Sequence, residues 1–198
     1  MSSFGIVALL GAAVVAQASQ FYQPLVAGAR WNYACTGGIT ATRSLALGAI
    51  NSQPGYLNTL TLTIPGQPQV QWSELDLNGP EGMRLGGFAF PPTYPSAQIN
   101  PPQVEIPNNP VFNQNVSFPD GFGGTLTVTY TGLGTLSVPA GTFTGVAIFK
   151  ETDNGGPPLP FPRTRYMAKG VGEVQMDLSA VAAQNLPAVT CQLVSYSL

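Results

Sequence analysis

The chain has 198 residues, of which 44% are hydrophobic and only 8% are charged, with seven basic residues, nine acidic residues and no histidine. So few and scattered cations exclude a basic nucleic-acid surface, and so much hydrophobic sequence at a net charge of -2 argues against disorder. The lack of histidine removes Ser-His-Asp and Cys-His triads and histidine metal sites.

The N-terminus has the pattern of an export signal. Residues 4–16 are apolar, and Ala16 and Ala18 provide the small side chains that a signal peptidase requires. The run is shorter than the roughly 20 residues that a membrane span needs. We therefore expect a signal peptide at 1–18, or alternatively a retained hydrophobic helix, before a single β domain at 19–198. The expected location is extracytoplasmic: periplasm, cell envelope or secreted.

Cys35 and Cys191 lie near the two ends of that domain. An even number of cysteines in an exported chain predicts a disulfide. This bond would join the first and last strands. A metal site made of two thiolates without a histidine is a much weaker alternative.

Apolar and polar residues alternate in many short segments. In the segment 56–64, Leu60, Leu62 and Ile64 share one face and threonines occupy the other. Strands are predicted at 31–36, 39–50, 56–64, 69–77, 83–90, 125–131, 135–138, 143–151, 163–169, 171–178 and 189–197. Turn signals separate them at 53–55, 65–68, 78–82 and 153–156. The predicted fold is all-β, an antiparallel curved sheet, half-barrel, barrel or sandwich of about ten strands, with at most one short helix at 178–185.

The segment 91–119 carries eight prolines. Proline donates no ladder hydrogen bond, so the segment cannot be a central strand. We expect either an ordered loop packed on the barrel or a flexible crossover between two halves. Tyr94, Val111 and Phe112 are the apolar residues that could anchor a partner there.

Carboxylate chemistry is the catalytic possibility that remains without histidine. Glu74 and Asp76 alternate on one strand and could flank a sugar, as glycosidase acids do. A solvated strand face or a bulge is the preferred interpretation. The segment 152–156 resembles part of a calcium loop, but a hairpin turn explains it more simply. We therefore predict no catalytic residues, no metal site and no cofactor.

The stretch 165–174, RYMAKGVGEV, combines cations, a tyrosine and two glycines. Its tyrosine and lysine are three residues apart, whereas short-chain dehydrogenases place them four apart on a helix. Gly170 and Gly172 favour a bulge or tight bend between strands. By their parity, Arg163, Arg165 and Lys169 would point to one side of the sheet and could meet the acidic residues Glu151 or Glu173 across strands.

Three segments together resemble a family. The sequences FYQPLVAGARWNY (21–33), LSVPAGTFTGVAIFKE (136–151) and RYMAKGVGEVQMD (165–177) are similar to bacterial secreted or lipoprotein domains of the cell envelope, related to the DUF3108 type. The resemblance implies a curved antiparallel sheet and no established catalytic residues. It also suggests that Trp31 and Tyr33 plug the barrel and that Gly141 permits a tight turn.

The expected function is a non-enzymatic structural or protein-binding component of the cell envelope. Its partners would be other envelope proteins or copies of itself. The alternative is a half-barrel that carries a lipid or another apolar small molecule. The aromatic residues that would line such a cavity are Trp31, Trp72, Phe88 and Phe90.

Overall fold

The computed structural model describes residues 22–90, 94–155, 162–182 and 185–198, except for the side chains of residues 94 and 95. The expected signal peptide therefore lies outside the described residues. The described strands are β1 (Arg30–Cys35), β2 (Thr40–Ile50), β3 (Gln53–Thr63), β4 (Val70–Asn78), β5 (Gly82–Phe90), β6 (Tyr94–Pro107), β7 (Asn115–Pro119), β8 (Thr125–Val138), β9 (Gly141–Asp153), β10 (Arg163–Ala168), β11 (Gly172–Leu178) and β12 (Val189–Ser197). The predicted all-β class is confirmed, with twelve strands in place of about ten.

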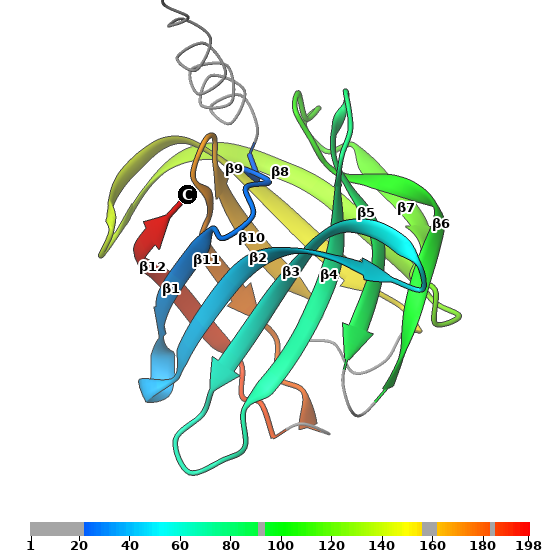
Figure 1. The fold of residues 1–198 in the computed structure, drawn as a ribbon. Helices are drawn as coiled ribbons and strands as arrows, with labels where there is room; N and C mark the ends of the chain where they lie inside the picture. The colour runs from blue at the N-terminus through cyan, green and yellow to red at the C-terminus, as the bar shows by residue number, and fades with distance from the viewer. Residues whose placement is uncertain (1–21, 91–93, 156–161, 183–184) are drawn as a thin grey trace, which may run out of the picture.

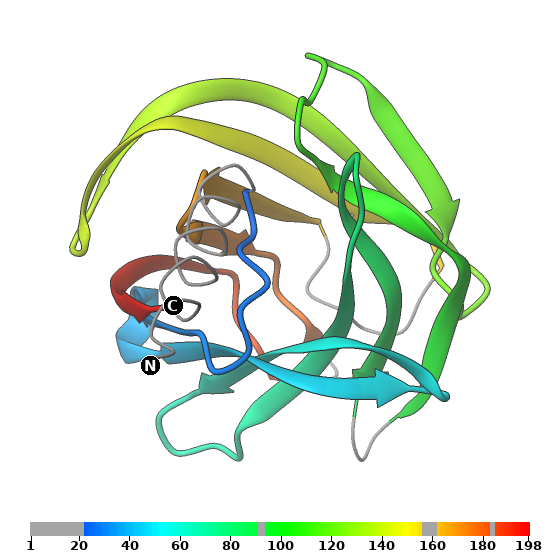
Figure 2. The same ribbon diagram turned by 45° about the horizontal axis from the view of Figure 1, so that its top comes forward.

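All twelve strands form one antiparallel sheet that curls into a nearly closed barrel (Figures 1 and 2). The order is β6-β5-β4-β3-β2-β1-β12-β11-β10-β9-β8-β7, so the first and last strands are neighbours. Strands β6 and β7 are the two edges of the sheet. We call the line along which these edges meet the seam. Among the described residues, no helix is long and apolar enough to cross a membrane.

The alternation read from the sequence explains which side chains fill the barrel. On β3, Leu60 and Leu62 are at most 1% exposed, whereas Thr63 is exposed. The turn predicted at 53–55 is wrong, because these residues already belong to β3. The chain reverses instead at Asn51 and Ser52, which both have positive φ angles of 48° and 68°. Two such residues make a hairpin turn whose twist suits the flanking strands.

The proline-rich segment is not one long loop. It forms the edge strands β6 and β7, joined by a connection at 108–114. The exclusion of a central strand is confirmed, because an edge strand needs ladder hydrogen bonds on one side only and tolerates proline on the other. The loop prediction fails because that one-sided pairing is still enough to make a strand.

The short helix predicted at 178–185 is also wrong for the residues described there. Leu178 ends β11, and Val181 then pairs with Leu186 in an isolated antiparallel bridge. Both of these residues are at most 5% exposed. A helix of eight residues is marginal in water without tertiary packing, and burial of Val181 and Leu186 in the core favours the bridged loop.

The disulfide predicted between Cys35 and Cys191 is present. The two residues face each other in the β1–β12 pairing, although 156 positions separate them in the sequence. The bond therefore joins the first and last strands, as expected. Disulfides are typical of proteins that fold in oxidising compartments.

Residues 22–29 precede β1 and run across the inside of the ring of strands (Figure 2). The ring of Tyr22 packs edge-on against Phe149 of β9, and Gly28 N–H donates to Leu45 O of β2. Tyr22 and Gln23 are 5% and 2% exposed. This segment therefore helps to fill the barrel.

Candidate functional site

The barrel encloses a group of charged side chains that we call the charged network. It comprises three arginines and five carboxyl groups, each at most 3% exposed. These eight are half of the sixteen charged residues, counted as seven basic plus nine acidic. Such burial is rare unless the charges are paired. The members are Arg43 on β2, Glu74 and Asp76 on β4, Glu105 on β6, Glu151 on β9, Arg163 and Arg165 on β10, and Glu173 on β11.

Arg163 contacts carboxyl groups from three different strands. Its Nη1 donates to Glu74 Oε1 at 2.5 Å, and its Nε donates to Glu151 Oε2. Its Nη2 lies 3.3 Å from Glu105 Oε1. A guanidinium presents donors in a planar fork, so one arginine can join β10 to β4, β6 and β9 through the interior.

Arg165 and Arg43 extend the network to the other side of the barrel. Arg165 Nη1 lies 3.4 Å from Glu105 Oε2, and Arg165 Nε lies 3.4 Å from Glu173 Oε1. Arg43 Nη2 is 2.7 Å from Glu173 Oε2, while Arg43 Nη1 donates to Asn58 Oδ1 at 3.0 Å. Glu173 is therefore held between two guanidiniums.

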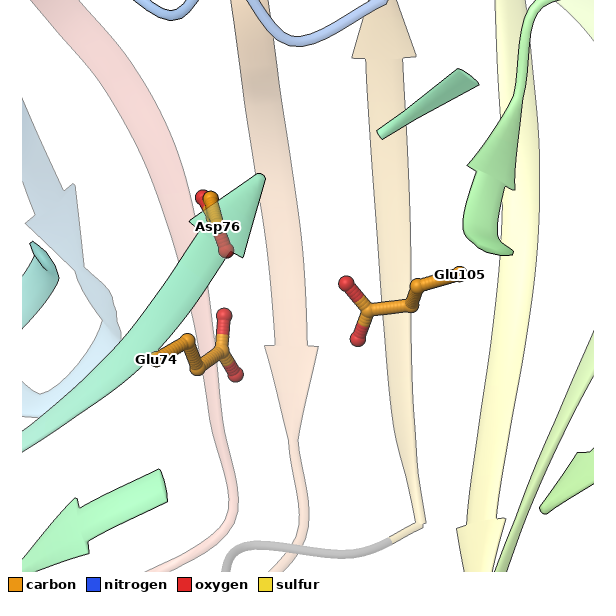
Figure 3. Close-up of side chains that lie close together, drawn as sticks. All are labelled: Glu74, Asp76 and Glu105. Carbon is orange, nitrogen blue, oxygen red and sulfur yellow. The ribbon is translucent and has the colours of Figure 1, made fainter. Parts of the chain in front are cut away.

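Three of the carboxyl groups lie close together (Figure 3). One carboxyl oxygen from each of Glu74, Asp76 and Glu105 falls within 4.8 Å of the others. Asn58 Nδ2 donates to Asp76 Oδ2 at 2.7 Å. Positive charge reaches this trio from the guanidinium of Arg163, which contacts two of its members. Arg163 thus pairs with Glu74 and Glu105, whereas the contact partner of Asp76 is the uncharged Asn58.

The pKa values of the trio move in opposite directions. Burial acts to raise the pKa of Glu74, but the nearby guanidiniums, Arg163 first, overcome it and hold that pKa at about 2. Burial and the charge of Glu74 raise the pKa of Asp76 to about 7. Burial, followed by the charge of Glu151, raises the pKa of Glu105 well above its usual value. One carboxyl group of the trio therefore favours the ionised form and two favour the neutral form.

The position of Glu74 and Asp76 corrects both parts of the sequence interpretation. β4 has no bulge at these residues, because its pairing with β3 is unbroken and the register shift beside Asp76 comes from an extra residue, Gly86, on β5. The solvated face is wrong, because both acids are fully buried. They share the parity of the buried Trp72, so simple alternation placed them inside. Neither residue lines a surface groove that a sugar chain could occupy.

The prediction that Arg163, Arg165 and Lys169 point to one side of the sheet is confirmed for the two arginines. Arg163 and Arg165 point inward and meet Glu151 and Glu173, as the cross-strand prediction required. Lys169 is exposed, and its Nζ lies 5.1 Å from the ring centroid of Tyr22. Lys169 lies beyond the end of β10, in the turn at 169–171, where the alternation of a strand no longer applies. The register shift between residues 166 and 167 comes from an extra residue on β11, Val174, and leaves the faces of β10 unchanged.

The stretch 165–174 is a hairpin. It contains the end of β10, a turn at 169–171 and the start of β11. Gly170 and Gly172 have positive φ angles of 73° and 103°, as a tight bend requires. The Tyr166 hydroxyl donates to Asp177 Oδ2 at 3.0 Å, whereas Lys169 lies over the ring of Tyr22.

The four aromatic residues predicted to line a ligand cavity are part of the core. Trp31, Trp72 and Phe88 are at most 1% exposed, and Phe90 is 4% exposed. Trp31 Nε1 donates to Val171 O at 2.6 Å, which ties β1 to the β10–β11 turn. The rings of Phe88 and Phe90 pack against Phe122 in the β7–β8 turn, at 6.4 and 5.9 Å.

A small pocket lies at the seam. Glu105 and Pro107 of β6 line one side, and Val111 and Val116 line the other. It has a volume of about 20 Å³, close to the space that one water molecule occupies. A lipid tail needs a cavity of a few hundred Å³. The pocket brings solvent close to Glu105.

The residues predicted to bind a partner fall in two regions. Val111 and Phe112 lie in the connection between β6 and β7 and are 61% and 63% exposed. The Phe112 ring packs edge-on against Tyr130 of β8 at 6.4 Å. Tyr94 begins β6, and its side chain lies outside the described part of the structure.

Sequence reasoning did not single out Arg43, Asn58 or Glu105 as functional residues. The signal available for Arg43 was its parity with the apolar Ala41 and Leu45 on β2. Glu105 carried no such signal, because its strand lies in the proline-rich segment. Asn58 follows the same inward parity as Leu60 on β3.

Comparisons of the chain with models of protein families, with curated proteins and with solved structures found no match.

Proposed function

We propose that this chain is a non-enzymatic, exported β-barrel that serves as a structural or protein-binding component of the cell envelope. The observation that carries the proposal is the filled interior. The described interior is occupied by the chain's own aromatic side chains and by the charged network. A rigid barrel whose inside is occupied presents its contacts on the outside.

The connection between β6 and β7 is the surface best suited to that contact. Val111 and Phe112 expose apolar side chains side by side in the sequence, next to the seam. Pro107 and Pro110 flank them and restrict the backbone, which lowers the entropy lost on docking. The edge-on packing of Phe112 against Tyr130 orients one of the two anchors.

Export is supported by two independent features. The N-terminal residues have the composition of a signal peptide, and the Cys35–Cys191 bond is of a kind that persists in oxidising compartments. The resemblance of three segments to bacterial envelope domains supports the same location.

The test is the double substitution Val111→Ser with Phe112→Ser in the full chain. We expect the variant to leave the membrane-associated fraction of fractionated cells while its thermal unfolding stays cooperative. Leu47→Ser and Leu133→Ser are matched controls, because these apolar side chains are 72% and 61% exposed elsewhere on the barrel.

Two results would count against the proposal. One is unchanged association of the Val111→Ser, Phe112→Ser variant. The other is native mass spectrometry that finds a lipid retained by the folded protein, which would favour the carrier.

A further inference from the structure

The positive and negative charges of the charged network do not cancel if every group is ionised. It holds three guanidiniums and five carboxyl groups, so full ionisation would leave two uncompensated negative charges inside the barrel. An isolated charge in such surroundings is strongly disfavoured, and a buried carboxyl group instead takes up a proton. Two bound protons make the network neutral.

The number and length of the arginine contacts differ among the five carboxyl groups. Glu151 and Glu173 each lie within 3.5 Å of Arg165 and also contact a second arginine. Glu74 is hydrogen-bonded to Arg163 at 2.5 Å. Asp76 has no guanidinium within 4.0 Å among the described residues.

Glu105 has no contact with an arginine as short as the shortest contact of Glu74, Glu151 or Glu173. Its contacts with Arg163 and Arg165 are 3.3 and 3.4 Å long. Asp76 and Glu105 are also the two carboxyl groups of the charged network whose pKa values are raised, in both cases by burial first and by a neighbouring carboxylate second. The charged groups that act on them are Arg43 on β2, Glu74 on β4, Glu151 on β9, and Arg163 and Arg165 on β10, and Tyr130 on β8 lines the pocket beside Glu105. Tyr33 on β1 and Glu173 on β11 lie next to Arg43 and Arg165.

We propose that the charged network is a proton-dependent lock: two protons held at Asp76 and Glu105 keep the barrel closed along its seam, and their loss as pH rises loosens the edge strand β6. Glu105 is the network residue on that edge strand. The β5–β6 ladder that holds β6 is interrupted by three register shifts. The pocket at the seam lies beside Glu105, which is itself fully buried, and has room for about one water molecule next to this carboxyl group.

The sign of the pH dependence follows from the direction of the two shifts. Asp76 has a pKa of about 7 when folded and 3.8 when unfolded, so between these values the folded chain binds more protons. The free energy of unfolding therefore falls as pH rises through this range. Glu105 acts in the same direction. The barrel is accordingly most stable in mildly acidic surroundings and weakens towards neutral and alkaline pH.

The absence of histidine makes this linkage measurable. Ordinary Asp and Glu titrate below pH 5, and the α-amino group titrates near pH 8, so proton uptake on folding at pH 6 must come from shifted carboxyl groups. We expect calorimetric unfolding of the full chain, in buffers of different ionisation enthalpy, to show about one to two protons bound on folding at pH 6. We also expect the urea midpoint to fall steadily from pH 5 to pH 8.

Two single variants and their double variant test whether Asp76 and Glu105 are the groups that bind the protons. Asp76→Asn and Glu105→Gln imitate the neutral acids, so each should bind fewer protons on folding, and the double variant should show a nearly flat urea midpoint across the same range. Glu81→Gln is the control, since that side chain is 72% exposed and should leave the slope unchanged. Wild-type stability that stays flat or rises from pH 5 to pH 8 would overturn the proposal, whether or not the variants fold. So would a double variant that keeps the wild-type slope.

Amide hydrogen exchange measures which strand loosens as pH rises. At pH 8 relative to pH 6, after correction for intrinsic rates, amides at 103–106 of β6 should lose more protection than amides at 41–45 of β2. Equal loss in both strands would show that the lock acts on the whole barrel, and would overturn the assignment to the seam.

Discussion

Arg163 Nη1 donates a hydrogen bond to Glu74 Oε1 at 2.5 Å across the interior of the barrel. The two residues are 89 positions apart, on strands β10 and β4, which are not neighbours in the sheet. Backbone hydrogen bonds hold each strand to the next around the wall. The Arg163–Glu74 contact instead joins opposite walls, so it opposes flattening of the curved sheet.

Replacing Arg163 should therefore be costly. Arg163→Met leaves Glu74 and Glu151 buried without that guanidinium, and we expect the free energy of unfolding to fall by about 3–5 kcal/mol. Glu74→Gln in the same chain should recover part of the loss, because it removes one stranded charge. Urea unfolding of the two single variants and the double variant measures the coupling.

Arg84→Met is the control for this cycle. Arg84 is 36% exposed, and its ion pair with Glu81 is 3.9 Å long, so its loss should change stability by less than about 1 kcal/mol. If Arg163→Met is no more damaging than Arg84→Met, the network does not support the fold in this way.

The disulfide should stabilise the fold by lowering the conformational entropy of the unfolded chain. Cys35→Ala with Cys191→Ala should lower the free energy of unfolding by about 2–5 kcal/mol, and reduction of the wild-type protein should give a similar loss. Thiol labelling of denatured protein recovered from the envelope should detect no free cysteine. Two labelled thiols in that sample would contradict the bond and the export that it supports.

Gly172 is expected to be sensitive to the smallest side chain. Its φ is 103°, and an added Cβ would lie 3.2 Å from both Gln23 Oε1 and Trp31 Nε1. Gly172→Ala should therefore lower the melting temperature and alter the fluorescence of the buried Trp31. Gly28→Ala separates strain from crowding, because Gly28 has a φ of 91° but nothing within 4 Å of the added Cβ. Equal effects of the two changes would show that backbone strain alone explains why glycine is needed at position 172.

The sequence by itself determined the β-structure and its covalent closure. Alternation in segments such as 56–64 specified which side chains are buried, because successive residues of a strand point to opposite faces. The two cysteines could pair only with each other in this chain, so their bond needed no knowledge of the fold. The glycines at 170 and 172 likewise indicated a bend, because few other residues adopt positive φ angles.

Only the tertiary structure decided where the charges lie. Glu74 and Asp76 have the parity of Trp72, yet burying them is favourable only because Arg163 and Asn58 reach them from other strands. Residues 94–107 become a strand only because β5 offers a partner at the sheet edge. Those partners are distant in sequence, and no local pattern encodes which strand curls round to meet which. The inward charges and the seam therefore follow from the closure of the barrel, which sets the long-range contacts that repay desolvation.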